Sequence, residues 1–104
     1  MLVNLTPHVI VAILASGDKL TLPPSGKVAR VSIASGVIGN LDGVPLARVV
    51  MGDIDGIPAP EEGTIFIVSA IVRGATTRSD VASPGDLVRD ANGQPIGCRS
   101  LIIN

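Results

Sequence analysis

The segment of residues 78–99, RSDVASPGDLVRDANGQPIGCR, concentrates the polar chemistry of this chain. It holds three of the six arginines and three of the seven aspartates. Arginine binds phosphate and carboxylate groups through paired hydrogen bonds, and the backbone amides of tight turns can cradle an anion. These residues therefore predict a site for a small anionic ligand, with Arg78, Arg89 and Arg99 as its anion contacts.

Other polar side chains are expected to support those arginines. Asp80 and Asp90 belong to the same expected site, and Asp90 could orient a guanidinium in the free protein. Hydrogen bonds that orient the ligand are expected from three further residues, namely Thr6, His8 and Ser69. A second interpretation stays open, in which the charged residues form strand-end salt bridges that contribute about 0–1 kcal/mol each when exposed.

A complete catalytic set is missing from the sequence. His8 is the only histidine, and no orienting acid or nucleophile lies next to it. Cys98 is the only cysteine, and its strand setting beside Gly97 favours a small buried filler over a nucleophile. The protein is therefore expected not to be an enzyme. A small hydrolase or lyase that uses His8 with Asp80 or Asp90 is kept as an alternative.

Metal and cofactor binding are not expected. Asp53, Asp55, Glu61 and Glu62 offer oxygen ligands, but their spacing is not that of a calcium loop. Aspartate before glycine is common in turns. A single cysteine also rules out a two-cysteine metal knuckle and an internal disulfide.

Short strands are expected to position these residues. Apolar and β-branched runs predict strands at residues 2–14 with a kink at Thr6-Pro7-His8, and at 19–22, 28–33, 46–51, 86–90 and 96–103. The longest apolar run, residues 64–72, is expected to be the central strand, with a buried helix as its rival. Residues 74–80 could wind one helical turn.

Turn signals separate these strands. Asp42-Gly43 and Asp55-Gly56 lie in two similar segments thirteen residues apart, and Asn92-Gly93 is a strong hairpin signal. With twelve glycines and eight prolines, the pattern predicts one all-β domain over residues 1–104, with at most one short helix. The expected architecture is a small sandwich or barrel of short antiparallel strands.

Composition suggests self-association in a reducing compartment. The chain is 46% hydrophobic and only 16% charged, so surplus apolar surface is expected to lie in a homo-oligomer interface. A net charge of −1 without a basic block argues against general nucleic-acid binding. No apolar run is long enough to cross a bilayer, and no signal peptide is expected. These features favour the cytoplasm.

Four segments carry a resemblance to a known family: NLTPH, LPPSG, GDIDGIPAPEEGTIFIVS and RSDVASPGDLVRDANGQPIGCR. Over nearly its whole length the chain resembles a family of short phage, prophage and bacterial proteins to which no activity is assigned. Phe66 stands where the family often has tyrosine. The positions that match the family signature are Asn4, Thr6, Pro7, His8, Ser69, Arg78, Asp80, Pro84, Arg89, Asp90, Gly97 and Cys98.

In general character such a protein is similar to phage anti-defence "sponges", which bind nucleotide signals without turning them over. We therefore expect a non-enzymatic, homo-oligomeric binding protein of the bacterial cytoplasm that sequesters a small anionic, nucleotide-like ligand. A protein-interaction or virion-accessory module is the main alternative. With no Trp, no Tyr and one Phe, stacking on a base would depend on arginine planes, proline or aliphatic side chains.

Overall fold

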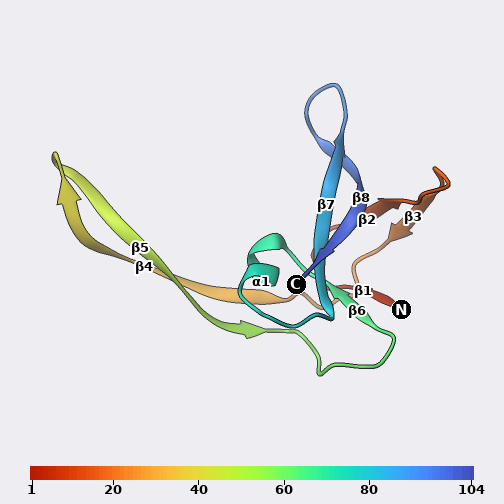
Figure 1. The fold of residues 1–104 in the computed structure, drawn as a ribbon, viewed down its shortest axis with the longest axis horizontal. Helices are drawn as coiled ribbons and strands as arrows, with labels where there is room; N and C mark the ends of the chain where they lie inside the picture. The colour runs from red at the N-terminus through yellow and green to blue at the C-terminus, as the bar shows by residue number, and fades with distance from the viewer.

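The computed structural model describes residues 1–104, the whole chain. Most residues lie in strands and one short helix is present, so the expected all-β class is confirmed (Figure 1). The elements are β1 (Leu2–Asn4), β2 (Ile10–Ile13), β3 (Lys19–Leu22), β4 (Arg30–Leu41), β5 (Val44–Asp55), β6 (Ile65–Ile67), α1 (Ala70–Gly74), β7 (Val81–Arg89) and β8 (Pro95–Ile103).

Six strands form one curled sheet in the order β1-β6-β7-β8-β2-β3. Its two edge strands approach each other, and the side-chain amide of Asn4 in β1 donates to the carbonyl of Leu22 in β3 at 3.0 Å. The sheet is therefore nearly closed and barrel-like. Three of its five pairings are parallel, so it is a mixed sheet where antiparallel pairing was expected.

The apolar run of residues 64–72 is not one central strand. It divides into β6 and α1, because Ser69 caps the helix by accepting a hydrogen bond from the Val72 N–H at 3.3 Å. The helix then links β6 to the parallel strand β7. It also lies one turn earlier than the helical turn expected at residues 74–80. The high content of Ile and Val in this run was a poor guide to its structure, because a single serine begins a helix inside it.

Strand β6 is buried on both faces and separates two small cores. Phe66 belongs to a cluster with Leu5, Ala29, Val68, Val72 and Val81, whereas Ile67 packs with Ile10 and Cys98. Alternating side chains of a strand point to opposite faces, so neighbours in β6 serve different clusters. Parallel strands covered on both sides are typically apolar throughout, as this one is.

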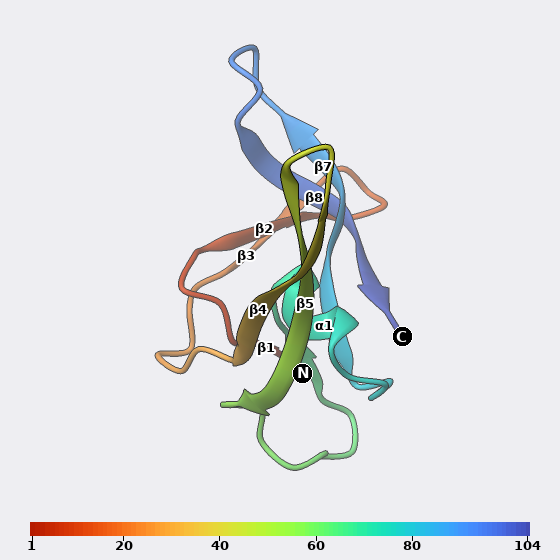
Figure 2. The ribbon, with the colours of Figure 1, turned by 90° about the vertical axis from the view of Figure 1, so that its left-hand side faces the viewer.

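Strands β4 and β5 form a separate two-stranded sheet that projects from the body, which we call the arm (Figures 1 and 2). Asp42 (φ 52°) and Gly43 (φ 81°) make its tip, and these positive angles are those of a type I′ hairpin turn. Both strands have 12 residues and are longer than the expected strands 28–33 and 46–51. All side chains of residues 32–53 are exposed.

The foot of the arm is rooted in the body. Val31, Ile54 and Ile57 pack against the core cluster that contains Phe66. Gly56 ends the arm with φ 95°, and a Cβ atom there would lie 2.6 Å from the carbonyl oxygen of Val28. This close approach requires glycine, because any side chain would collide with backbone.

The molecule is elongated for its length. Its radius of gyration is 16.6 Å, whereas a compact domain of this length has about 13 Å. Only 15 of 104 residues are buried, which is a small core for an isolated chain. None of its helical segments has the length and apolar character of a membrane span.

Candidate functional site

One cavity of about 660 Å³ lies at the foot of the arm. Its walls come from β2, α1, the start of β4 and the β7–β8 hairpin, so it occupies the corner where the arm and that hairpin leave the body (Figure 1). The lining is mainly apolar and includes Val9, Ile33, Ile71, Leu87 and Ile96, each about half exposed. Small-molecule sites have this size and this apolar character.

Few polar side chains reach the cavity. Arg30 is the only charged residue in its lining, and it forms no ion pair although Asp55 is its cross-strand neighbour. Thr6, His8 and Ser69 also line it. An apolar cavity with one arginine in its lining can hold a ligand that combines an apolar ring with an anionic group.

The NLTPH segment supplies one wall of the cavity and is held by a local hydrogen-bond network. The Asn4 amide donates to the carbonyl of His8 at 2.8 Å, while its oxygen accepts from the Thr6 N–H at 2.9 Å and the Thr6 hydroxyl at 2.7 Å. The Thr6 hydroxyl in turn accepts from the His8 N–H at 3.3 Å. This hydrogen-bond network fixes the kink at Pro7 and places the exposed His8 at the cavity.

Cys98 lies in the floor of the cavity and is buried. Burial raises the pKa of its thiol, because the thiolate would lose its hydration. A raised pKa disfavours the nucleophilic form of the side chain. Cys98 therefore acts here as a small apolar wall residue.

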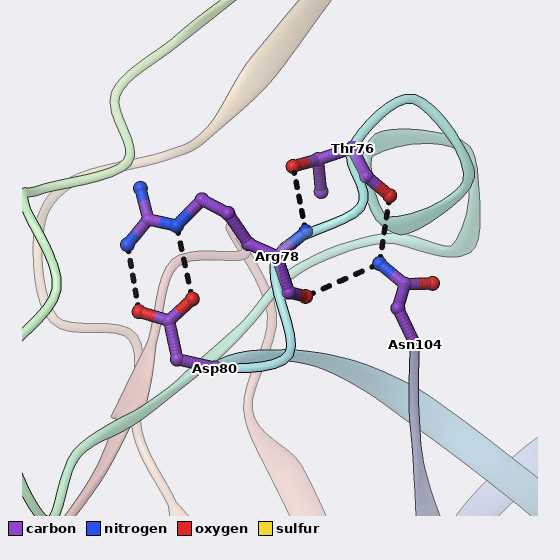
Figure 3. Close-up of polar contacts among 4 residues, drawn as sticks. All are labelled: Thr76, Arg78, Asp80 and Asn104. Atoms are coloured by element: carbon purple, nitrogen blue, oxygen red, sulfur yellow. Dashed lines mark hydrogen bonds and ion pairs between the residues drawn. The ribbon is translucent and has the colours of Figure 1, made fainter.

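Arg78 and Asp80 form the only ion pair of the chain and lie outside the cavity lining (Figure 3). The guanidinium donates twice to the carboxylate, at 2.9 Å from Nε and 2.7 Å from Nη2. The hydrogen bond from Arg78 lowers the pKa of Asp80, and the same bond raises the pKa of Arg78. The guanidinium carbon also lies 5.9 Å from the centre of the Phe66 ring.

The loop that carries Arg78 is held from two sides. The hydroxyl oxygen of Thr76 accepts from the Arg78 N–H at 3.2 Å. The side-chain amide of Asn104 donates to the carbonyls of Thr76 at 2.7 Å and Arg78 at 3.3 Å (Figure 3). These contacts fix the loop against the end of β8 and give Arg78 a structural role.

Arg89 and Asp90 belong to the turn of the β7–β8 hairpin. Arg89 donates to the carbonyl of Gly93 at 2.8 Å, and the Asp90 carboxylate accepts from the backbone N–H groups of Asn92 and Gln94. The hairpin expected at Asn92-Gly93 is present, with Gly93 at φ 79°. Asp90 therefore orients the turn and not a guanidinium.

Arg89 and Arg99 lie on the paired strands β7 and β8, as expected, but Arg78 is not brought to them within one chain. Arg78 precedes β7 and Arg89 ends it. The nine residues of this strand, at about 3.3 Å per residue, place its two ends roughly 25 Å apart. Arg99 is exposed on β8 and does not line the cavity. Residue chemistry suggested the cluster, but the length of β7 keeps Arg78 apart from Arg89.

The structure therefore divides the expected site residues into two groups. Thr6, His8 and Ser69 meet at the cavity, whereas Arg78, Asp80, Arg89, Asp90 and Arg99 lie outside its lining. Arg30 was missed as a site residue. The signal for it was an arginine that interrupts an apolar strand directly after Val28 and Ala29.

No His, Cys, Asp and Glu side chains gather in a group that could hold a metal ion. Comparisons of the chain with protein-family models, with curated proteins and with solved structures find no match.

Proposed function

We propose that this protein is a non-enzymatic binding protein that works as a homo-oligomer and sequesters a small anionic, nucleotide-like ligand. Its role would be that of a sponge that removes a signalling nucleotide in the cytoplasm of a bacterial host, as anti-defence proteins do. The observation that carries the proposal is the apolar cavity with one charged residue in its lining, Arg30, which forms no ion pair.

The shape and chemistry of the cavity support a ligand of this class. A volume of about 660 Å³ matches sites that hold drug-sized molecules. Ile and Val side chains and Pro7, Pro84 and Pro95 offer flat apolar surfaces for a ring, as expected for a chain that lacks Trp and Tyr. Arg30 can bind a phosphate with two hydrogen bonds.

The catalytic alternative gains no support from the geometry. His8 makes hydrogen bonds only through its backbone, and the carboxylates of Asp80 and Asp90 bind Arg78 and the hairpin turn. The three groups therefore do not form an acid–base pair in this arrangement.

The first test compares ligand binding by two arginine variants. A panel of cyclic dinucleotides, oligonucleotide signals and ADP-ribose derivatives is screened by thermal shift and then by calorimetry. We expect at least one compound to bind the native chain and to bind Arg30→Gln about 10–100-fold more weakly, because a charge-assisted pair of hydrogen bonds is lost.

Arg48→Gln is the matched control. Arg48 is also an exposed arginine of the arm but does not line the cavity, so its loss should leave affinity unchanged. No binding by any compound of the panel, or equal weakening by both variants, would contradict the proposal.

The exposed apolar surface of the arm favours a second candidate, a protein-interaction or virion-accessory module. In that case the arm would bind a different protein, and the purified chain would be a monomer without a small ligand. The measurement of mass described below separates the two candidates.

A further inference from the structure

The central part of the arm has one fully uncharged face. The register of β4 against β5 shifts between Val31 and Ile33 and again between Val37 and Gly39. Between these two irregularities the pairing is regular, and partners across the strands share a face. One face, which we call the apolar face, carries Ile33, Ser35, Val37, Ala47, Val49 and Met51. The opposite face carries Ala34, Gly36, Arg48 and Val50. Only the opposite face has a charge, so the apolar face can be covered without burying one.

The apolar face is open to solvent in the isolated chain. Val37 is 70% exposed, Val49 59% and Ile33 53%. A two-stranded hairpin is marginally stable by itself in water, and it usually needs a covered apolar face. We therefore expect another protein surface to cover the apolar face of the arm.

The area to be covered fits a second copy of the chain. The accessible surface is 6968 Å², whereas a compact monomer of 10.5 kDa has about 5,400 Å². The excess of about 1,500 Å² exceeds the roughly 800 Å² that each partner buries in a standard interface. An uncharged, contiguous face is also suited to contact its own copy, since no like charges would meet.

The place of the apolar face on the arm determines where a partner's tip would lie. Its centre is the pair Ser35 and Val49, near the middle of β4 (Arg30–Leu41) and β5 (Val44–Asp55). When a two-fold axis passes through this point perpendicular to the arm, the arms run antiparallel and the tip of each lies beside the foot of the other. The cavity lies at that foot, and Ile33 belongs to both the apolar face and the cavity lining.

We propose that two copies pair arm against arm through the apolar face, and that the tip of the partner's arm closes the cavity of the first copy. Leu41 and Val44 form the apolar part of the tip and are 65% and 59% exposed. They would add apolar side chains to the lining of the cavity at the foot of the arm. The partner thus contributes residues to the ligand site of the proposed function.

The decisive test measures the mass of the ligand-free protein by sedimentation equilibrium and native mass spectrometry. We expect twice the chain mass of 10.5 kDa. Val49→Asp should weaken the dimer about 100-fold or more, because it buries an unpaired charge at the centre of the apolar face. Val50→Asp is the matched control: Val50 is also 59% exposed but lies on the opposite face, so the dimer should persist.

Two readouts keep the test independent of folding defects. Circular dichroism checks that both aspartate variants keep the fold of the body. In a Cys98→Ala background, Ser35→Cys should link two chains through a short bismaleimide, whereas Ala34→Cys on the opposite face should not. A monomeric native chain, or equal behaviour of the paired variants, would overturn arm pairing.

Closure of the cavity is tested with an introduced fluorophore. The chain has no Trp or Tyr, so Ile71→Trp at the cavity would be the sole source of tryptophan emission. Emission should be blue-shifted in the dimer and move to longer wavelength when Val49→Asp is added. Equal emission in dimer and monomer would refute closure by the partner. Because these measurements use no ligand, their failure is distinct from failure of the ligand panel.

Discussion

Arg78 and Asp80, which form the only ion pair of the chain, stabilise the local structure of a loop. Arg78 holds Asp80 through two hydrogen bonds, and Asn104 and Thr76 hold the surrounding loop. The sequence alone suggested a ligand contact for the same two residues. A guanidinium that is already paired with a carboxylate must break that pair before it binds an anion, whereas Arg30 at the cavity is free of such a partner.

The ion pair predicts a defined pH dependence of stability. The pKa of Asp80 is lowered in the folded state, so the pair stabilises the fold above the unfolded pKa of about 4. This stabilisation is lost as the pH falls below about 4 and through the folded pKa. The melting temperature of Asp80→Asn should therefore be below that of the native chain at pH 6, and the gap should narrow under acidic conditions.

Arg78→Gln provides the control for this prediction. In that background the carboxylate has lost the cation that is the main cause of its lowered pKa, so the effect of Asp80→Asn on the melting temperature should change much less with pH over the same range. A gap that stays constant in the native background would show that the pair does not couple to folding.

At the residue scale, three of the eight residues expected at the ligand site line the cavity, namely Thr6, His8 and Ser69. Arg78 was expected close to Arg89 but lies at the other end of β7, because residue type and spacing do not tell how far a strand carries two side chains apart. Arg30 was overlooked because one charged residue in an apolar strand is as typical of a solvent-facing position as of a site.

The arm is the element on which the candidate site and the proposed assembly both depend. Its foot packs on the core through Val31 and Ile54, and Gly56 brings its end against the Val28 carbonyl. A change at this contact should loosen the wall of the cavity that β4 provides. The arm thus links packing in the body to the geometry of the site.

Gly56→Ala tests the rooting of the arm. The new Cβ would lie 2.6 Å from the Val28 carbonyl oxygen, in addition to the strain of a positive φ. Gly63→Ala is the matched control, since Gly63 also has a positive φ (76°) but no atom within 4 Å of such a Cβ. We expect chemical denaturation to give a loss of about 1–2 kcal/mol for Gly63→Ala and at least twice that loss for Gly56→Ala. Similar losses would show that the contact with Val28 is unimportant.

Element boundaries were predictable where turns and burial agreed. Residues 19–22 were expected as a strand and form β3, and the Asp42-Gly43 turn and the hairpin around Gly93 are both present. Two features were not predicted. Strand β4 is longer than expected, since Gly36 and Gly39 look like strand breakers in the sequence but lie within the strand. The run of residues 64–72 changes from strand to helix at Ser69.

At the scale of the whole molecule, the composition and the elongated shape both indicate surplus apolar surface. A chain that is 46% hydrophobic and 16% charged was expected to carry surplus apolar surface. The structure places much of that surface on the arm and in the open cavity at its foot. The sequence could not show this location, because an alternating apolar strand has the same pattern whether its own core or another chain covers it.

Native mass spectrometry of the protein purified from bacterial cells tests the central claim most directly. We predict an assembly of at least twice the 10.5 kDa chain mass that retains a small anionic molecule, released on denaturation and absent from Arg30→Gln. A single chain of 10.5 kDa that carries no additional mass would contradict the account.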